Sequence, residues 1–164
     1  MCSKKNFNLT YTFKLFYSLP ATMYHLVYIS EAKERMTLTT LVVILMQARA
    51  LNERRDVTGA LVYGDGQFMQ VIEGEQGVVQ SLYEHIAKDP RHHHVRMLAE
   101  GPIETRRFTQ WSMAFGEVPA DQFQVLRRVA EYQTPEELAE QITANKAIDG
   151  LLLDKMNELV QMQG

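Results

Sequence analysis

The chain has 164 residues, of which 46% are hydrophobic and 23% are charged, and its formal net charge is −3. This composition favours one globular domain, and the weak negative charge gives no general attraction to nucleic acid or anionic membranes. The single cysteine, Cys2, excludes an internal disulfide and a cysteine-based zinc site. No apolar run approaches the roughly 20 residues that span a bilayer, so we expect a cytoplasmic protein.

The first 22 residues differ from the regular pattern that begins at Met23. They resemble a signal peptide weakly, but Lys14 interrupts the apolar stretch and no small-residue cleavage site follows. We therefore expect residues 1–22 to be an unstructured extension. The alternative is a helix that docks on the domain, since termini are poorly ordered unless they are tied down.

The next segment carries a strand pattern followed by a helix pattern. Residues 24–30 form a β-branched and aromatic run of strand length. Thr37 is a candidate N-cap for a helix that ends near Asn52. Val43 and Ile44 add a second apolar face to this helix, which predicts that it is covered on two sides. Its main apolar stripe consists of Leu38, Leu41, Val42, Leu45 and Met46.

A β-hairpin is predicted in the middle of the chain. Two apolar runs, residues 57–63 and 68–72, flank the Gly-Asp-Gly at 64–66. Gly and Asp tolerate the positive φ of tight hairpin turns. Gln70 lies among apolar residues of the second strand, where an unpaired buried amide costs about 1–3 kcal/mol. Gln70 therefore either bonds to the backbone or faces a ligand.

Helix and strand patterns continue after the hairpin. A second amphipathic helix is predicted over residues 76–88, where an Asp-Pro pair stops it. Alternating apolar residues then predict a strand around residues 95–99. A last strand is predicted over residues 111–115, and the spacing of two would place Trp111 and Met113 on one face of it.

The order of these elements predicts the fold class. It is an α+β fold, a ferredoxin-like β-α-β-β-α-β-β sheet with two helices on one face. Beyond Pro119 the pattern is helical, with a capping box at residues 134–137. These C-terminal helices must bury their apolar stripes, and the opposite face of the sheet is available for them.

A metal site is not predicted. His92, His93 and His94 are adjacent, and three successive residues in a loop or strand cannot all face one ion. No His-x-x-x-His spacing is present. We interpret these histidines as part of a polar loop and the start of a strand.

Enzymatic and nucleic-acid functions have weak signals. The chain contains no Gly-x-Ser-x-Gly and no phosphate-binding loop motif, and it has no cysteine placed as a nucleophile. A ferredoxin-like phosphatase could place an asparagine and arginines on an anion, which Asn52 and nearby arginines imitate loosely. Direct RNA binding on the sheet face is disfavoured by the overall acidity.

Several separated motifs together resemble the BLUF family, the flavin-binding sensors of blue light. The match covers residues 23–115, and no single piece of it is decisive. The pieces are Leu-Val-Tyr28-Ile-Ser, Asn52, the run Val57–Gly74, the stretch from Ile86 through Asp89-Pro-Arg91-His92, and Arg-Arg-Phe-x-x-Trp111-Ser-Met113. Their occurrence in this order makes the resemblance specific.

The resemblance implies an FAD cofactor between the two helices that cover one face of the sheet. It implies that Asn52 bonds to the edge of the isoalloxazine ring. It places Asp89, Arg91 and His92 where the ribityl chain and the phosphates are contacted. The implied cofactor-binding residues are Tyr28, Asn52, Gln70, Ile86, Asp89, Arg91 and His92.

The resemblance also implies a light-driven switch. Tyr28 is the electron and proton donor to the excited flavin, and Gln70 bridges Tyr28 to the ring. After charge recombination the Gln70 amide remains rearranged, by rotation or tautomerism, and donates to the flavin C4 carbonyl. Such an amide has two satisfied hydrogen-bond arrangements, as a bistable element requires. Trp111 and Met113 would carry the change toward the C-terminal helices.

Three parts of the chain follow from this reading. They are an extension at 1–22, a BLUF flavin-binding domain at 23–116 and C-terminal capping helices at 117–164. No enzymatic output domain is recognisable, so we expect a non-enzymatic photoreceptor that acts on a separate signalling partner or on copies of itself, as a homo-oligomer. The alternatives are a small phosphate hydrolase and a colourless protein-interaction module.

Overall fold

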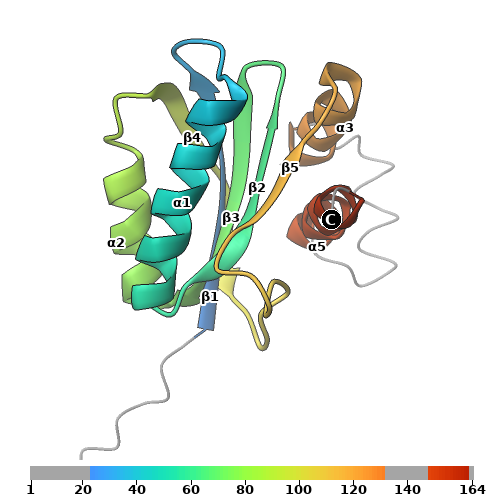
Figure 1. Ribbon diagram of the computed structural model, residues 1–164. Helices are drawn as coiled ribbons and strands as arrows, with labels where there is room; N and C mark the ends of the chain where they lie inside the picture. Colours follow the sequence, from blue (N-terminus) through green and yellow to red (C-terminus); the bar gives the residue numbers. More distant parts are fainter. Residues whose placement is uncertain (1–22, 132–147, 163–164) are drawn as a thin grey trace, which may run out of the picture.

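The computed structural model describes residues 23–131 and 148–162 of the chain. It contains a five-stranded sheet with helices on both faces (Figure 1). The predictions for residues 1–22 and for the capping box at 134–137 lie outside the described residues. Within the described ranges, none of the helices has the length and apolar content that crossing a membrane would need.

The elements follow the predicted order, and the ferredoxin-like arrangement is confirmed. The strand order is β4-β1-β3-β2-β5, in which the first four strands pair antiparallel and β5 pairs parallel with β2. The bounds are β1 (Met23–Ala32), α1 (Leu38–Arg54), β2 (Thr58–Gly64), β3 (Gln67–Glu75), α2 (Gln76–Ile86), β4 (His92–Pro102), β5 (Ala114–Glu117), α3 (Ala120–Glu131) and α5 (Ile148–Gln161).

Local sequence signals determine the ends of α1 and the turn of the hairpin. The hydroxyl of Thr37 accepts a hydrogen bond from the backbone N–H of Thr40 at 3.2 Å, which confirms Thr37 as the N-cap. Asp65 and Gly66, with φ of 52° and 71°, form the two-residue turn between β2 and β3. Positive φ at both positions matches the twist of the flanking strands, and the hairpin is confirmed.

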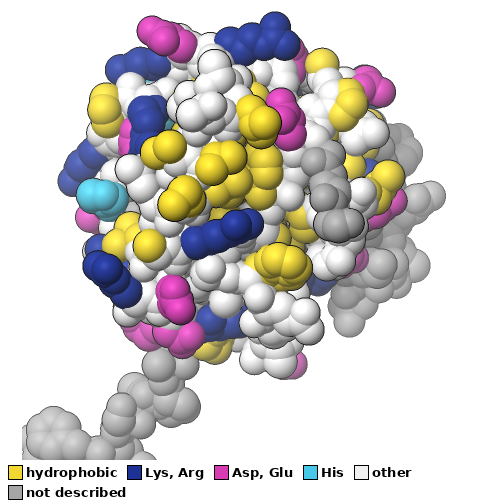
Figure 2. Space-filling view, viewed as in Figure 1, with side chains coloured by type: hydrophobic (Ala, Val, Ile, Leu, Met, Phe, Trp, Pro, Cys, Tyr) yellow, Lys and Arg dark blue, Asp and Glu magenta, His cyan; other side chains and the backbone are white. Residues whose placement is uncertain are grey.

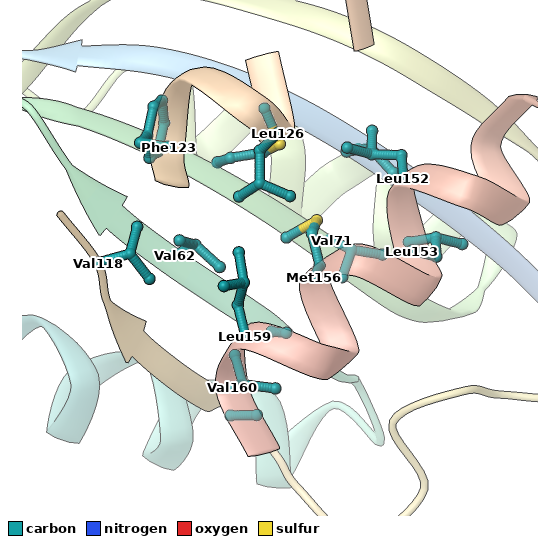
Figure 3. Close-up of a cluster of buried hydrophobic side chains, with 14 of the residues drawn as sticks. Val62, Val71, Val118, Phe123, Leu126, Leu152, Leu153, Met156, Leu159 and Val160 are labelled. Carbon is teal, nitrogen blue, oxygen red and sulfur yellow. The ribbon is translucent and has the colours of Figure 1, made fainter. Parts of the chain in front are cut away.

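Alternation along the strands divides the core into two layers. Tyr28 and Leu61 face α1 and α2, whereas their neighbours Val27 and Val62 face α3 and α5. As predicted, the C-terminal helices bury their apolar side chains on the face opposite α1 and α2 (Figure 1). Figure 3 shows this second layer, with Val62, Val71, Val118, Phe123, Leu126, Leu152, Leu153, Met156, Leu159 and Val160.

The outer side of α1 carries more apolar surface than predicted. Leu41 and Leu45 are buried, but Leu38 and Met46 of the same predicted stripe are 70% and 66% exposed. Val43, which was expected on a covered face, is 45% exposed, so that prediction is wrong for this residue. Leu38, Val42 and Met46 are spaced four apart and form one row along the helix, which lies on the outer side of the buried row of Leu41 and Leu45. Figure 2 shows hydrophobic side chains gathered over α1.

The connection between β4 and β5 is irregular where a strand was predicted. The strand β5 begins only at Ala114, so Trp111 and Met113 precede it and do not follow strand alternation. The side chain of Trp111 is half exposed, whereas Met113 is completely buried. The prediction that Trp111 and Met113 share one face of a last strand is therefore wrong.

Glu73 of β3 explains part of this irregular path. Its buried carboxylate accepts hydrogen bonds from the backbone N–H of Arg107 at 3.0 and 3.1 Å and from that of Phe108 at 3.1 Å. Arg106 adds an ion pair to Asp56 at 2.8 Å. Because these bonds use the backbone of the connection, they hold it in a conformation that is not extended.

We expect Glu73→Ala to lower the free energy of unfolding by roughly 3 kcal/mol, because it removes the acceptor of two backbone N–H groups. Urea denaturation followed by circular dichroism measures this change. Glu104→Ala removes an exposed carboxylate from the same connection and should stay within about 0.5 kcal/mol of the parent. Equal stability of the two variants would contradict the anchoring role of Glu73.

Candidate functional site

A cavity of about 440 Å³ lies between α1 and α2 over the middle strands of the sheet. Its volume is within the roughly 300–1,000 Å³ of small-molecule sites. Its floor is formed by Tyr28 of β1, Leu61 of β2 and Phe68 and Gln70 of β3. The walls are apolar on both sides, with Ile44, Ala48 and Leu51 from α1 and Leu82 and Ile86 from α2.

One face of α1 is a wall of this cavity. Ile44, Gln47, Ala48 and Leu51 all line it, and they are spaced three and four residues apart as one face of a helix requires. Of this wall, only Ile44 belongs to the second apolar face predicted from the sequence. The spacing of Ile44, Ala48 and Leu51 is the signal that could have found the rest.

Tyr28 and Gln70 form a pair on the cavity floor. They are register partners in the antiparallel pairing of β1 with β3, so their side chains leave the same face of the sheet. The hydroxyl of Tyr28 donates a hydrogen bond to Oε1 of Gln70. Burial raises the pKa of Tyr28 well above its ordinary value. The phenol therefore keeps its proton at neutral pH.

The amide of Gln70 has unequal partners on its two sides. Its Nε2 donates to the Sδ of Met113 at 3.5 Å, and a thioether is a weak acceptor. Its Oε1 accepts from the much stronger donor Tyr28. If the amide oxygen and nitrogen exchanged places, little hydrogen-bond energy would be lost at Met113. The hydrogen bond from Tyr28 therefore determines the orientation of the Gln70 amide.

The C-terminal end of α1 holds the backbone just before β5. Nδ2 of Asn52 donates to the carbonyl of Ser112 at 2.7 Å, and Nε of Arg49 donates to the carbonyl of Met113 at 3.0 Å. An asparagine amide has two N–H groups and an oxygen, so one bond does not exhaust Asn52. Sequence reasoning missed Arg49 and Ser112, because contacts between residues some 60 positions apart leave no local pattern.

Charged groups lie at the rim of the cavity. Arg91 donates to both carboxylate oxygens of Asp89, and its Nη1 donates to Oε1 of Gln47 at 2.9 Å. The hydrogen bonds from Arg91 lower the pKa of Asp89, and the same bonds raise the pKa of Arg91. Arg54 also lines the cavity. The cavity lining thus includes two arginines and one aspartate. Gln47 and Arg54 were not among the predicted flavin-binding residues.

His92 has both ring nitrogens engaged by protein groups. Its Nε2 lies 2.7 Å from the carbonyl of Ile86, and its Nδ1 lies 2.8 Å from Oγ of Ser30. A carbonyl only accepts, so Nε2 carries a proton, and in the neutral ring Nδ1 accepts from the Ser30 hydroxyl. The ring of His92 thus lines the cavity, and its two contacts connect β4 to β1 and to the end of α2.

The structure brings most of the predicted site residues together. Met113 reaches the site through its contact with Gln70. Trp111 is the exception, since it does not line the cavity and its side chain is half exposed. The predicted residues that line the cavity are Tyr28, Asn52, Gln70, Ile86, Asp89, Arg91 and His92.

Comparison of the sequence with known proteins gives one family and a group of relatives. The BLUF family model, described as sensors of blue-light using FAD, matches residues 23–114. Photoactivated adenylate cyclase subunit alpha of Euglena gracilis is 42% identical over 81 residues, which are 49% of this chain and 8% of that protein. Subunit beta of the same organism is 33% identical over 93 residues, 56% of this chain and 11% of that protein. The chain thus spans about a tenth of the length of these curated relatives.

Solved structures agree with the sequence comparison. The photo-activated state of BlsA is 28% identical with a TM-score of 0.63, and the match covers 84% of this chain and 94% of that one. The dark state of BlrB, a BLUF protein, is 27% identical with a TM-score of 0.60, and the match covers 80% of this chain and 96% of that one. The family model matches more than half of the chain, and the chain belongs to the BLUF family of flavin-binding blue-light sensors.

Proposed function

We propose that this chain is a blue-light photoreceptor that binds FAD in the cavity between α1 and α2. The observation that carries the proposal is the hydrogen-bonded pair of Tyr28 and Gln70 on the floor of that cavity. The residues fit a flavin. Apolar walls on two sides suit a flat aromatic ring system, and the buried amides of Asn52 and Gln70 offer donors and acceptors to its polar edge.

The rim supports a flavin that carries phosphate groups. Arg54 and Arg91 line the cavity, and a guanidinium group matches the geometry of phosphate oxygens. The ion pair with Asp89 and the bond to Gln47 orient Arg91 and leave part of its five N–H donors for a ligand. Two arginines suit the pyrophosphate of FAD, the cofactor in the family description.

The proposed switch uses the chemistry of Tyr28 and Gln70. When bound and excited by blue light, the flavin supplies an electron acceptor. Tyr28 would give up an electron together with its phenolic proton, which would leave along the hydrogen bond to Oε1 of Gln70, and both would return to Tyr28 when the charges recombine. The amide of Gln70 would be left rearranged, so that a donor points where the carbonyl oxygen accepted before: an N–H after rotation, or an O–H after tautomerism. The weak bond to the Sδ of Met113 opposes this change little.

Met113 is proposed to pass the change to the other side of the sheet. It contacts Gln70 and leads directly into β5, against which α5 packs. Trp111 lies on the same connection, and its carbonyl accepts a hydrogen bond from Gly59 of β2 at 3.3 Å. In this proposal residues 23–116 form the flavin-binding unit. Residues 117–164 form a cap that responds to a change in the position of β5.

We propose that the light signal passes to a separate effector protein or to other copies of the chain. A relative of known structure supports a separate effector. It is a bacterial light-regulated adenylyl cyclase, and the match covers 75% of this chain and 34% of the cyclase chain. Its cyclase activity belongs to that protein. We propose that the present chain senses light and has no catalytic activity of its own.

An absorption spectrum of the purified full chain, recorded in darkness and directly after blue light, tests the function. We expect a flavin band that moves to the red and returns in darkness. A flavin band that does not move would contradict the Tyr28–Gln70 switch. A protein that stays colourless after addition of FAD would overturn the proposal in favour of an interaction module, or of a hydrolase if it cleaves phosphate esters. Chromatography of the released cofactor distinguishes FAD from FMN.

A further inference from the structure

A second cluster of ligand-type side chains lies at the edge of the sheet, outside the cavity proposed for the flavin. It consists of Glu31 on β1 and His93 and His94 on β4. Each offers one ligand atom, and these atoms lie within 4.8 Å of one another. Glu31 and His93 are register partners across the β1–β4 pairing.

An irregularity in β4 explains how two successive histidines reach the same carboxylate. In a regular strand, neighbouring side chains point to opposite faces. His94, however, has a φ of 50°, and the β1–β4 register shifts between Ile29 and Glu31. Such a bulge suspends the alternation. As predicted, the three adjacent histidines do not face one point, since His92 turns to Ser30, but the other two converge on Glu31.

The two distances from the carboxylate of Glu31 are close to those between ligand atoms of a small tetrahedral metal ion. Oε2 of Glu31 lies 3.1 Å from Nδ1 of His94 and 3.6 Å from Nε2 of His93. Bonds of 2.0–2.2 Å to a tetrahedral ion place its ligand atoms roughly 3.3–3.5 Å apart. Nδ1 of His93 is buried and has no hydrogen-bond partner among the described residues, so no bond at that nitrogen competes for the ring.

The left-handed backbone at His94 is a further reason to assign a function to the cluster. A residue other than glycine in this region costs about 1–3 kcal/mol and persists where surrounding structure enforces it. The contacts of His93 and His94 with Glu31 are between partly exposed groups, and such contacts contribute little stability. A ligand that binds both imidazoles and the carboxylate would offset the strain.

We propose that Glu31, His93 and His94 form a binding site for a divalent transition-metal ion, with Zn²⁺ as the best match. Two imidazoles and one carboxylate are a ligand set that zinc prefers, and three protein ligands leave a fourth position for water. A hollow of about 400 Å³ beside Glu31 and His94 has room for it. Two of the site's three ligands are imidazole nitrogens, which disfavours Ca²⁺ or Mg²⁺, because these ions need several oxygen ligands.

The metal would connect β1 to β4 next to the wall of the flavin cavity. The residues just before Glu31 and His93 are Ser30 and His92. Oγ of Ser30 and Nδ1 of His92 lie 2.8 Å apart. An ion held by both strands therefore fixes their separation at this contact. Because it binds the folded state, it raises the thermal stability of the protein.

Calorimetric titration with ZnCl₂ tests the site. The protein is the full chain without a polyhistidine tag, treated with a chelator and carrying Cys2→Ser so that the thiol does not contribute. We expect one saturable site per chain. Glu31→Gln and His94→Ala should each weaken binding at least about tenfold, because loss of an outer-shell partner alone typically costs 10–100-fold. Glu34→Gln removes an exposed carboxylate from the following loop and should bind like the parent.

Thermal unfolding in the presence of ZnCl₂ gives a second readout that does not depend on the flavin. Zinc should raise the Tm of the parent and of Glu34→Gln, and it should leave the Tm of Glu31→Gln and His94→Ala unchanged. Absence of a saturable site with one ion per chain would overturn the proposal. Binding that is unchanged in either ligand variant would overturn it as well.

Discussion

Gln70→Leu is expected to abolish the light-induced red shift while the flavin remains bound. Leucine is close in size to glutamine and suits the apolar neighbours of β3, so the cavity floor keeps its shape. It has neither the oxygen that accepts the Tyr28 proton nor the N–H groups that would replace that oxygen after illumination. The spectrum should therefore show a flavin band that is the same before and after blue light.

The matched control for this variant is Gln110→Leu. It makes the same chemical change at an exposed position of the connection before β5, away from the cavity lining. This variant should keep the full shift and its recovery in darkness. A normal shift in Gln70→Leu would defeat the assignment of the switch, and loss of flavin from Gln70→Leu alone would show that the amide is needed for binding.

Tyr28→Phe is expected to stop or severely impair the photocycle. The substitution keeps the aromatic ring, which packs against Tyr83 with 5.7 Å between ring centroids, and removes only the hydroxyl. Without the phenolic hydroxyl, no side chain on the cavity floor can donate an electron and a proton together. Absorbance recorded over time after a blue pulse measures the yield of the shifted form.

Tyr83→Phe controls for the loss of a hydroxyl near the same position. Tyr83 contacts the ring of Tyr28 without bonding to Gln70, so its variant should complete the cycle. An unimpaired cycle in Tyr28→Phe would contradict its role as donor. Equal impairment in both variants would indicate that the cycle needs both hydroxyl groups, and would contradict a specific role of the Tyr28 proton.

The fold could be predicted because its signals are local. The cap at Thr37, the turn at Asp65 and Gly66 and the alternation along the strands each involve residues a few positions apart. Each signal constrains φ and ψ or the direction of side chains directly. The whole sequence of strands and helices up to β5 followed from such signals.

The irregular connection could not be predicted in the same way. Its path depends on Glu73, Arg49 and Asn52, which lie 34 to 64 residues away from the groups they bind. Period-two spacing of Trp111 and Met113 suggested a strand that these long-range bonds prevent. The bulge at His94 is a similar case, because the positive φ of one residue reverses the expected direction of its side chain.

The site was visible only in part. Gln70 was conspicuous as an amide in an apolar strand, and the structure explains its position by the register of β1 and β3. Its bond to Tyr28 depends on that register, which no pattern within either strand specifies. The resemblance to a family identified Tyr28 and Asn52 as site residues, and spacing alone left each with an ordinary structural explanation.

The bonds from Arg49 and Asn52 end on main-chain carbonyl oxygens, and this has a consequence for how such a protein can diversify. A carbonyl is present whatever the side chain, so substitutions at residues 112 and 113 keep both anchors. The position of the backbone therefore does not depend on which side chain residue 113 places beside Gln70. A substitution of Met113 therefore changes the group that contacts Gln70 and leaves in place the two bonds that hold the backbone.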